Sequence, residues 1–252
     1  MLVAAHNAAE FPTDPLYLPV QVGHALATID LRIQLDDTGD NISLLNRPYG
    51  ELTALYWAWK NLDAKAIGLS HYRRYFRGSA AGPNGTRVLD SQEASALLER
   101  FDIVIAKPRN YVIETIESHY RHAHVGEDLD VTRRALQALS PDYLPAFEQV
   151  FAGRRLSLYN MFLMRRELFD DYAAWLFPLM DEVYRQIDTA SRSAYQERAI
   201  GYLGERLLNV WVRQNTALHA VGFLPVVHTT PEPKVRKAVA MLGRNVRGGS
   251  RR

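Results

Sequence analysis

Residues 67–76 read IGLSHYRRYF, a short apolar run that ends in a cluster of cationic and aromatic side chains. The run Ile67–Leu69 is typical of a buried strand, and His71, Arg73 and Arg74 follow it directly. In open α/β sheets, ligands bind just beyond the carboxyl ends of the strands, and arginine forks match pairs of phosphate oxygens. The stretch therefore favours a diphosphate site, although, taken alone, an aromatic edge whose arginines face water explains it better.

Strands and helices alternate along the chain on either side of this stretch. Apolar runs predict further strands at Leu2–Ala5, Ile29–Leu35, Phe101–Ala106, Leu156–Met164 and Gly222–Val227. Helical spacing predicts helices at Glu51–Asn61, Gln92–Arg100, Ile113–His124, Val131–Leu139, Pro141–Phe151, Glu167–Ile187 and Tyr195–Val212. The alternation predicts a single α/β domain whose mixed, mostly parallel sheet is flanked by helices. The proline-rich segment 12–19 is expected to be irregular, and residues 78–86 are expected to form a flexible loop that could close over a ligand.

The composition excludes several classes of protein. Of the 252 residues, 47% are hydrophobic and 23% charged, the balance of a folded globular protein. Cysteine is absent, which excludes a disulfide framework, a thiolate zinc site and a cysteine nucleophile. The phosphate-loop, dinucleotide-binding and nucleophile-elbow motifs are also absent, so the corresponding ATPases, dehydrogenases and hydrolases are excluded. No apolar run is long enough to span a bilayer, and the expected location is the cytoplasm.

The C-terminal segment differs in charge from the rest of the chain. Residues 231–252 hold seven basic residues and one acidic residue, a net charge of +6, so the preceding 230 residues carry −4 of the total +2. We therefore expect a domain over residues 1–228 and a basic tail over residues 229–252. The tail is expected to contact an anionic surface, in particular the inner face of a membrane, with a solvated terminus as an equal alternative.

A second predicted strand also ends in basic and aromatic residues. Phe101–Ala106 is followed by Lys107, Arg109 and Tyr111. If this strand end lies beside the one at His71, the two would form a floor that attracts phosphate.

Acidic and histidine-rich segments suggest polar sites with more than one explanation. The acidic turn that begins at Asp36 and Asp37 lacks the closing glutamate of an EF-hand, so it is either a plain turn or a contact to ribose or base. His119, His122 and His124 have a spacing that zinc could use, but histidines without an HExxH order more often line a polar pocket or the surface.

Two further polar positions are open to more than one reading. Asp128 and Asp130 form a literal DxD, although Asp130 is better explained as a helix N-cap. Asn160 interrupts an apolar run, so it either satisfies backbone groups or points at a ligand.

Six segments carry a resemblance to a known family. They read DDTGDNIS (36–43), NRPYGELTALYWAWKN (46–61), IGLSHYRRYF (67–76), KPRNYVIETIESHY (107–120), NMFLM (160–164) and YLGERLLNVW (202–211). In this order they resemble the DUF-type family of bacterial capsular and exopolysaccharide biosynthesis proteins, over roughly Leu2–Val227. Gly50 departs from the family pattern, in which a cysteine is expected, and is not expected to touch the chemistry.

The resemblance implies a GT-A-type glycosyltransferase that moves galactofuranose, with inversion, from a UDP-sugar donor to a surface-polysaccharide acceptor such as an O-antigen or capsule glycan, free or lipid-linked. In this reading His71, Arg73 and Arg74 stand where GT-A enzymes hold a metal with two aspartates. Arg73 or Arg74 would stabilise the leaving diphosphate without a metal cofactor, with Arg73 as the catalytic candidate, and a divalent metal remains the alternative.

The resemblance also implies roles for residues outside the central stretch. Glu205 would be the general base that takes the proton from the acceptor hydroxyl. The remaining donor-binding residues would be His6, Asp36, Asp37, Lys107, Arg109 and Asn160. The acceptor-binding residues would be His119, His124 and Asp128, and Asp128 is also the reserve base. The structural alternative for Glu205 is a helix-surface residue paired with Arg206 or Asn209.

Two other functions compete with this hypothesis. A retaining or pyranose-specific UDP-hexosyltransferase fits the same residues. A non-catalytic module that binds nucleic acid or glycan could also use the interleaved arginines and aromatics. The net acidic body and the placement of the cations at strand ends argue against nucleic acid as a partner.

Overall fold

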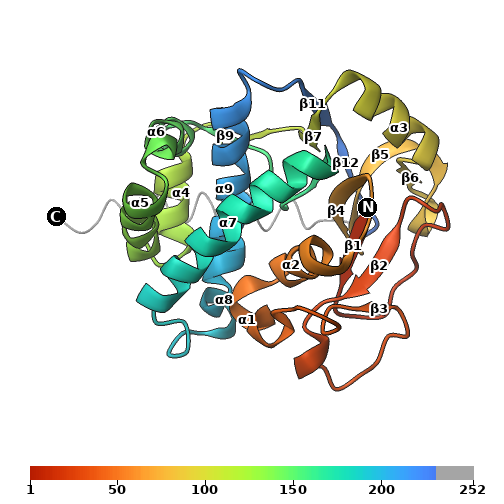
Figure 1. Cartoon of the computed structure of the whole chain (residues 1–252), viewed down its shortest axis with the longest axis horizontal. Helices are drawn as coiled ribbons and strands as arrows, with labels where there is room; N and C mark the ends of the chain where they lie inside the picture. The colour runs from red at the N-terminus through yellow and green to blue at the C-terminus, as the bar shows by residue number, and fades with distance from the viewer. Residues whose placement is uncertain (231–252) are drawn as a thin grey trace.

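The centre of the computed structural model, which describes residues 1–230, is a twisted sheet in the order β11-β7-β10-β4-β1-β2-β3 (Figure 1). Along this order β10 runs antiparallel to both of its neighbours, and the other pairs are parallel. The bounds are β1 Leu2–Ala5, β2 Leu18–Gln21, β3 Gln34–Leu35, β4 Ala66–His71, β7 Ile103–Ala106, β10 Phe162–Arg165 and β11 Val221–Leu224. The predicted mixed, mostly parallel sheet is therefore confirmed.

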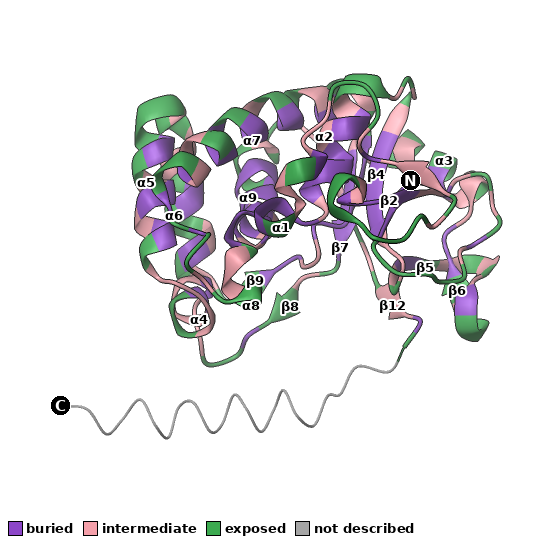
Figure 2. Ribbon diagram, turned by 90° about the horizontal axis from the view of Figure 1, so that it is seen from below, coloured by how far each residue is buried: buried purple, intermediate pink, exposed green. Residues whose placement is uncertain are grey.

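Helices cover both faces of the sheet, which is why β1 and β7 read as continuous apolar runs and are buried along their whole length. On one face α7 (Arg166–Gln186) packs against β4 and β10, with α2 (Leu52–Asn61) and α9 (Ala199–Asn215) against α7. On the other face lies α3 (Ser91–Arg100), whose capping box is closed by Asp90 and Glu93 (Figure 2). Ile103 and Ile105 face the large core under α7 and α9, while Val104 and Ala106 face the smaller core under α3.

The remaining elements surround this centre. The helices are α1 Asn46–Tyr49, α4 Ile116–Ala123, α5 Glu127–Leu139, α6 Leu144–Ala152 and α8 Ala194–Glu197, with 3-10 turns at His24–Leu26, Ser43–Leu45, Pro83–Gly85 and Pro141–Tyr143. The strands are β5 Arg74–Ala81, β6 Arg87–Val88, β8 Arg109–Asn110, β9 Arg155–Leu156 and β12 Val226–His228.

The central stretch forms a hairpin. β4 ends at His71, residues Tyr72 and Arg73 form the turn, and β5 begins at Arg74, which pairs with His71. β5 then continues to Ala81 and pairs with β6 and β12. The prediction of a flexible loop from residue 78 is wrong over its first four residues. Gly78 allows the strand to continue there because a Cβ would lie 2.5 Å from the Cα of Leu89.

Three other predicted strands differ from the structure. The proline-rich segment contains β2, which was expected to be irregular, while the predicted strand Ile29–Leu35 is reduced to β3. The run Leu156–Met164 is divided into β9 and β10 by a turn at Tyr159 and Asn160. The last predicted strand is divided into β11 and β12 at Pro225.

Two predicted helices begin or divide elsewhere. The C-terminal helix is interrupted at Arg198, which separates α8 from α9. The prediction that Asp130 caps a helix is wrong, because α5 begins three residues earlier at Glu127. Asp130 lies inside the first turn and pairs with Arg121 at 2.7 Å and with Arg133 at 3.3 Å.

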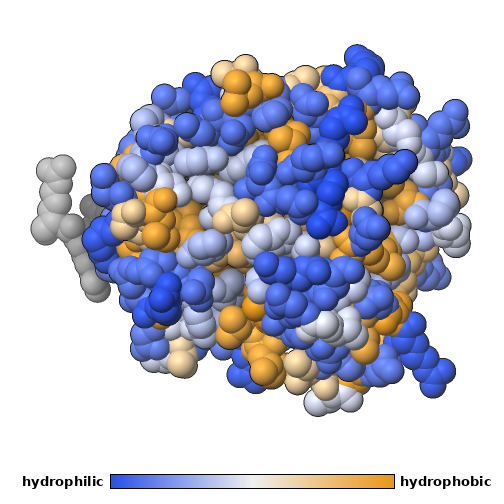
Figure 3. Space-filling view, viewed as in Figure 1, coloured by the Kyte–Doolittle hydropathy of each residue, from blue (hydrophilic) through white to orange (hydrophobic). Residues whose placement is uncertain are grey.

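The surface viewed in Figure 3 is mostly hydrophilic, with apolar side chains in small separate patches. Within the described residues, none of the helices combines the length and the apolar character that crossing a bilayer requires. The predicted basic tail lies outside the described residues except for Thr229 and Thr230.

Candidate functional site

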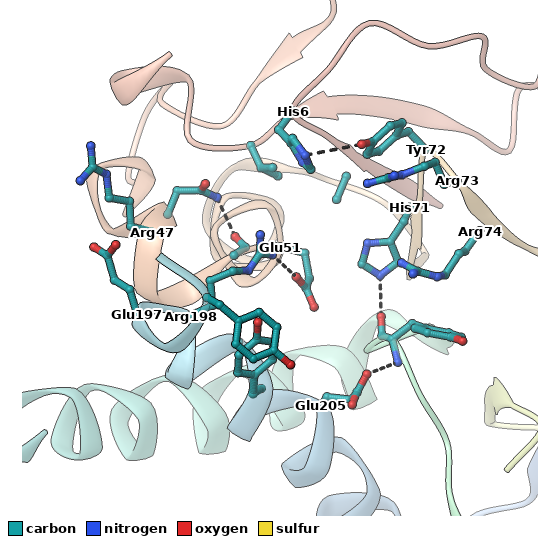
Figure 4. Close-up of a pocket in the computed structure, with 18 of the residues that line it drawn as sticks. His6, Arg47, Glu51, His71, Tyr72, Arg73, Arg74, Glu197, Arg198 and Glu205 are labelled. Atoms are coloured by element: carbon teal, nitrogen blue, oxygen red, sulfur yellow. Dashed lines mark hydrogen bonds and ion pairs between the residues drawn. The ribbon is translucent and has the colours of Figure 1, made fainter. Parts of the chain in front are cut away.

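A pocket of about 840 Å³ opens at the carboxyl ends of β1 and β4. Five of the residues singled out from the sequence line it: His6, His71, Arg73, Arg74 and Glu205. They come from the segment after β1, from the β4–β5 hairpin and from α9, so the fold brings together residues up to 199 positions apart. The opposite wall is built from α1, α8 and the start of α2 (Figure 4).

Arginines outnumber carboxylates in the lining of this pocket. Figure 4 shows Arg73 and Arg74 on one side and Arg47, Glu197 and Arg198 on the other. Arg73 lies 4.7 Å from the ring of Tyr72, and Arg74 lies 4.4 Å from the ring of Tyr159. Stacking on an aromatic face orients a guanidinium while its N–H groups can still donate to an oxyanion. With four arginines and three glutamates, the pocket favours an anionic ligand.

His71 is fixed by a hydrogen bond at the carboxyl end of β4. Its Nε2 lies 2.6 Å from the carbonyl oxygen of Tyr159. A carbonyl oxygen only accepts, so Nε2 carries the proton and Nδ1 is left as an acceptor in the neutral ring. Burial lowers the pKa of His71 from 6.5, against a smaller opposing effect of Glu51. At neutral pH His71 is therefore a neutral ring, and the arginines supply the positive charge that was expected from all three residues.

Glu205 is held on the wall of the pocket by α9. Its Oε2 accepts from the backbone N–H of Tyr159 at 2.5 Å, and its Oε1 accepts from Arg206 at 3.1 Å. Burial raises the pKa of Glu205 above 4.5, although Arg206 and the Tyr159 N–H act in the opposite direction. A carboxylate with a raised pKa is a stronger proton acceptor than an exposed one. The predicted alternative contact to Arg206 is present, but it does not remove Glu205 from the pocket lining.

The turn at Tyr159 and Asn160 connects several residues of this site. Both residues have positive φ, 75° and 53°, a region that costs a residue with a Cβ roughly 1–2 kcal/mol. His71 binds the Tyr159 carbonyl, Glu205 binds the Tyr159 N–H, and Glu51 accepts from the Asn160 side-chain amide at 2.7 Å. These three contacts hold the strained turn in place, in agreement with the tendency of backbone strain to gather at functional sites.

Glu51, Gly50 and Arg198 were not predicted as site residues, and all three line the pocket. Glu51 accepts from Asn160, and its other oxygen lies 3.7 Å from Arg198. Gly50, expected away from the site, has φ 58° and ψ −131°, and a Cβ there would lie 3.0 Å from the Arg198 guanidinium. The signal in the sequence was a glycine followed by an acid at the entry to the clearest helix.

His6 stands at the rim, with its ring 5.2 Å from that of Tyr72. Burial, followed by Arg198 and Arg73, lowers the pKa of His6 from 6.5. His6 lines the pocket, and its donor-binding role stays a prediction.

Three other predicted donor-binding residues, Asp36, Asp37 and Asn160, lie outside this lining. Asp36 is completely buried, and its carboxylate accepts hydrogen bonds at 2.5–3.1 Å from Gly23, His24, Ser43 and Thr53. Asp37 lies 2.6 Å from the Nδ1 of His24. Asn160 is buried within the turn, with its Nδ2 on Glu51 and its Oδ1 without a hydrogen-bond partner.

Lys107 and Arg109 line a second, smaller pocket of about 270 Å³, together with Pro225, Val226 and His228. The two pockets share Tyr159. The expected single floor of phosphate-binding side chains is therefore two pockets on either side of one aromatic residue.

The predicted acceptor-binding residues lie behind the wall formed by α8 and α9. The ring of His124 packs against Tyr195 and Tyr202, which line the main pocket, and burial followed by Arg206 and His119 lowers its pKa to about 3. His119 packs against Tyr111 at 4.3 Å. Asp128 is buried, and both of its oxygens bind Arg192 at 2.8 Å. Across residues 1–230, no group of three or more histidine or carboxylate side chains is placed to hold a metal ion.

Comparisons with known proteins agree with this architecture. A family model described as Domain of unknown function (DUF4422) matches residues 1–216. Among solved structures, the chain is similar to the apo structure of WbbM, described as a bifunctional glycosyltransferase, with a TM-score of 0.80 and 26% sequence identity. The match covers 92% of this chain and 45% of the WbbM chain, so this chain spans less than half of that protein. No curated protein matches the chain.

Proposed function

The chain belongs to the DUF4422 family, and we propose that it is a glycosyltransferase that uses a nucleotide-sugar donor. The observation that carries the proposal is the main pocket, where stacked arginines and half-buried carboxylates meet at the carboxyl ends of β1 and β4. Ligands of α/β sheets bind at this edge. The similarity to one part of a bifunctional glycosyltransferase supports the same proposal.

The pocket provides the two functions that sugar transfer requires. Arg73 and Arg74 stabilise the negative charge that develops on the diphosphate as the bond from the anomeric carbon to the phosphate oxygen breaks. Glu205 accepts the proton of the acceptor hydroxyl, whose oxygen forms the new bond to the anomeric carbon. The electron pair of the broken bond leaves with the diphosphate, so charge and protons balance without an additional reactant.

The finer proposal concerns the donor and the outcome. We propose UDP-galactofuranose as the donor, inversion at the anomeric carbon, and a surface-polysaccharide glycan, free or lipid-linked, as the acceptor. These assignments rest on the resemblance of the six sequence segments. Inversion needs one base on the acceptor side, and Glu205 supplies it. The domain that performs the reaction is proposed to be residues 1–228.

Glu51, which was not predicted as a site residue, is a second candidate for the base because its carboxylate lines the same pocket. Both of its oxygens face partners, Asn160 at 2.7 Å and Arg198 at 3.7 Å. We assign Glu51 the positioning of the Tyr159–Asn160 turn and Glu205 the proton transfer. A Glu51→Gln variant that loses transfer while Glu205→Gln retains it would reverse this assignment.

The test is calorimetric titration of the full chain with UDP, followed by a transfer assay with UDP-galactofuranose and UDP-galactopyranose, each with and without chelator. We expect UDP to bind, the furanose donor to be used, and chelator to leave turnover unchanged. Binding of an oligonucleotide in place of UDP would contradict the proposal, and turnover lost in chelator and restored by Mn²⁺ would identify a metal-dependent reaction.

A further inference from the structure

Two large aliphatic side chains are exposed next to each other on the loop between β8 and α4. Val112 is 65% exposed and Ile113 is 55% exposed. Of the large apolar residues that are exposed within residues 1–230, these are the only two that are adjacent in sequence. Isolated exposed aliphatic residues are common, whereas an adjacent pair at the end of a loop forms a small apolar surface that is available for contact with another apolar phase.

The loop holds this pair outward at a cost in backbone energy. Val112 has φ 62°, which is rare for a β-branched residue. Its N–H donates to Asn110 Oδ1 at 2.9 Å, and its carbonyl accepts from Arg154 Nη1 at 3.0 Å. Ile113 N–H donates to the carbonyl of Tyr111 at 2.7 Å. The exposure of this Val112–Ile113 tip is therefore fixed by hydrogen bonds on both sides of it.

Exposed basic side chains lie on the two chain segments next to the tip. Lys107, Arg109, Arg154 and Arg155 are all exposed. The pairing of β8 with β9 places Arg109 opposite Leu156 and Asn110 opposite Arg155, so the two basic segments lie side by side. The nearest carboxylate in sequence, Glu114, is mostly buried and binds His122 at 2.8 Å. An apolar tip beside exposed cations matches the chemistry of an anionic lipid surface.

The position of the tip relates it to the main pocket. β8 directly follows β7, so it lies at the carboxyl edge of the sheet, where the main pocket opens. Arg109 lines the second pocket, which shares Tyr159 with the main pocket. Figure 2 shows β8, β9 and β12 at the same side of the molecule.

We propose that the Val112–Ile113 tip, with its four basic neighbours, docks the protein on an anionic bilayer and turns the carboxyl edge of the sheet toward the lipid. Val112 and Ile113 enter the boundary between headgroups and acyl chains, and the basic residues contact lipid phosphates. This contact is separate from the predicted role of the basic tail and does not depend on turnover.

The test compares full-length variants in a vesicle co-sedimentation assay, with vesicles of phosphatidylcholine alone or of three parts phosphatidylcholine to one part phosphatidylglycerol. In the Val112→Asn/Ile113→Asn variant, asparagine tolerates positive φ and removes the apolar groups. We expect on the order of tenfold weaker binding to the anionic vesicles. Arg154→Gln/Arg155→Gln should weaken binding by about fivefold per residue, less at high salt.

The matched control is Leu218→Asn. Leu218 is 78% exposed and precedes β11, which is parallel to β7, so it lies at the opposite edge of the sheet. This variant should bind vesicles as the unmodified chain does. Every variant retains the basic tail, so the differences report on the tip.

Three results would overturn the proposal: no binding of the unmodified chain to anionic vesicles, equal loss in the Leu218 control, or full binding by the variant with both tip residues changed. Transfer to a soluble acceptor should be unchanged in the tip variants. If the tip variants retain vesicle binding but lose that transfer, the tip serves the acceptor and the membrane role is wrong. If no variant, including the unmodified chain, transfers sugar, the proposed function fails while the vesicle result stands.

Discussion

Two basic strand ends, His71–Arg74 at the end of β4 and Lys107–Arg109 after β7, have different surroundings in the folded chain. The first lines a pocket of about 840 Å³ that also contains carboxylates. The second lines a pocket of about 270 Å³ whose lining, within the described residues, includes no acid. The difference follows from the sheet order, because β10 lies between β4 and β7.

β10 is antiparallel, so its amino end lies at the carboxyl edge of its two neighbours. The turn at Tyr159 and Asn160, which precedes β10, therefore stands between the two basic strand ends. A basic, aromatic strand end indicates an anionic ligand, and the helices beside it decide whether that ligand also meets a carboxylate: Glu197 and Glu205 of the first pocket come from α8 and α9, and Glu51 precedes α2. In this molecule we assign the reaction to the first pocket and contact with a charged surface to the second region.

The largest effect is expected at the carboxylate of the first pocket. Glu205→Gln keeps the shape and the hydrogen bond to the Tyr159 N–H but removes the base. Turnover should fall by roughly 10²–10⁴-fold while UDP affinity stays within about twofold. Calorimetry and a transfer assay on the same preparation measure both quantities.

Glu197→Gln is the matched control, since Glu197 lines the same pocket. It should retain most of the activity. Normal transfer by Glu205→Gln would reduce Glu205 to support of the turn and would make Glu51, which lines the same pocket, the next base to test. Asp128, the reserve base expected from the sequence, lies outside this pocket with both oxygens bound to Arg192.

Removal of the basic side chains is expected to affect the two regions differently. If Arg73 stabilises the leaving diphosphate, Arg73→Ala should weaken UDP binding and slow turnover by about a hundredfold. Lys107→Ala/Arg109→Ala should leave both within about threefold, because these residues lie in the other pocket. Equal losses in the two variants would restore the expectation of a single phosphate floor.

The pH profile gives a smaller and graded effect. Glu205 must be ionised to accept a proton, and burial raises its pKa above 4.5. The value of kcat/KM should therefore decline as pH falls through that raised pKa, by about tenfold per pH unit below it. Burial lowers the pKa of His71 from 6.5, so His71 can also contribute to the acid limb, and the profile of Glu205→Gln separates the two groups. An unchanged acid limb in that variant would assign the limb to His71.

Much of the fold followed from the sequence, and the exceptions have physical causes. LVAA, AIGL and IVIA are apolar because helices or strands cover both of their faces, and each is a strand. β2 was missed because Pro19 argues against a strand. The structure tolerates it because the two-residue β3 pairs only with Val20 and Gln21, leaving Pro19 beyond its end.

The site was less predictable than the fold. His71, Arg73 and Arg74 were found because they are contiguous and follow a strand. Glu51 and Arg198 were missed because each is an ordinary residue at the end of a helix. They are 147 positions apart in the sequence and meet only because α9 packs beside α1. No local pattern encodes such a meeting.

The smallest expected effect concerns the backbone strain at the Tyr159–Asn160 turn and at the Val112–Ile113 tip. Tyr159 and Asn160 hold positive φ with three side-chain contacts to the first pocket, whereas Val112 holds φ 62° at an exposed tip. Val112→Asn relieves the strain and loses little packing, because Val112 is 65% exposed. We expect stabilisation by about 1 kcal/mol, or roughly 2–4 °C in Tm for a chain of this size.

Ile113→Asn is the control with similar exposure and no positive φ, and its Tm should stay nearly constant. If Val112→Asn unfolds at a lower temperature than the unmodified chain, the positive φ of Val112 does not lower stability. The tip would then not retain backbone strain in order to expose its apolar side chains.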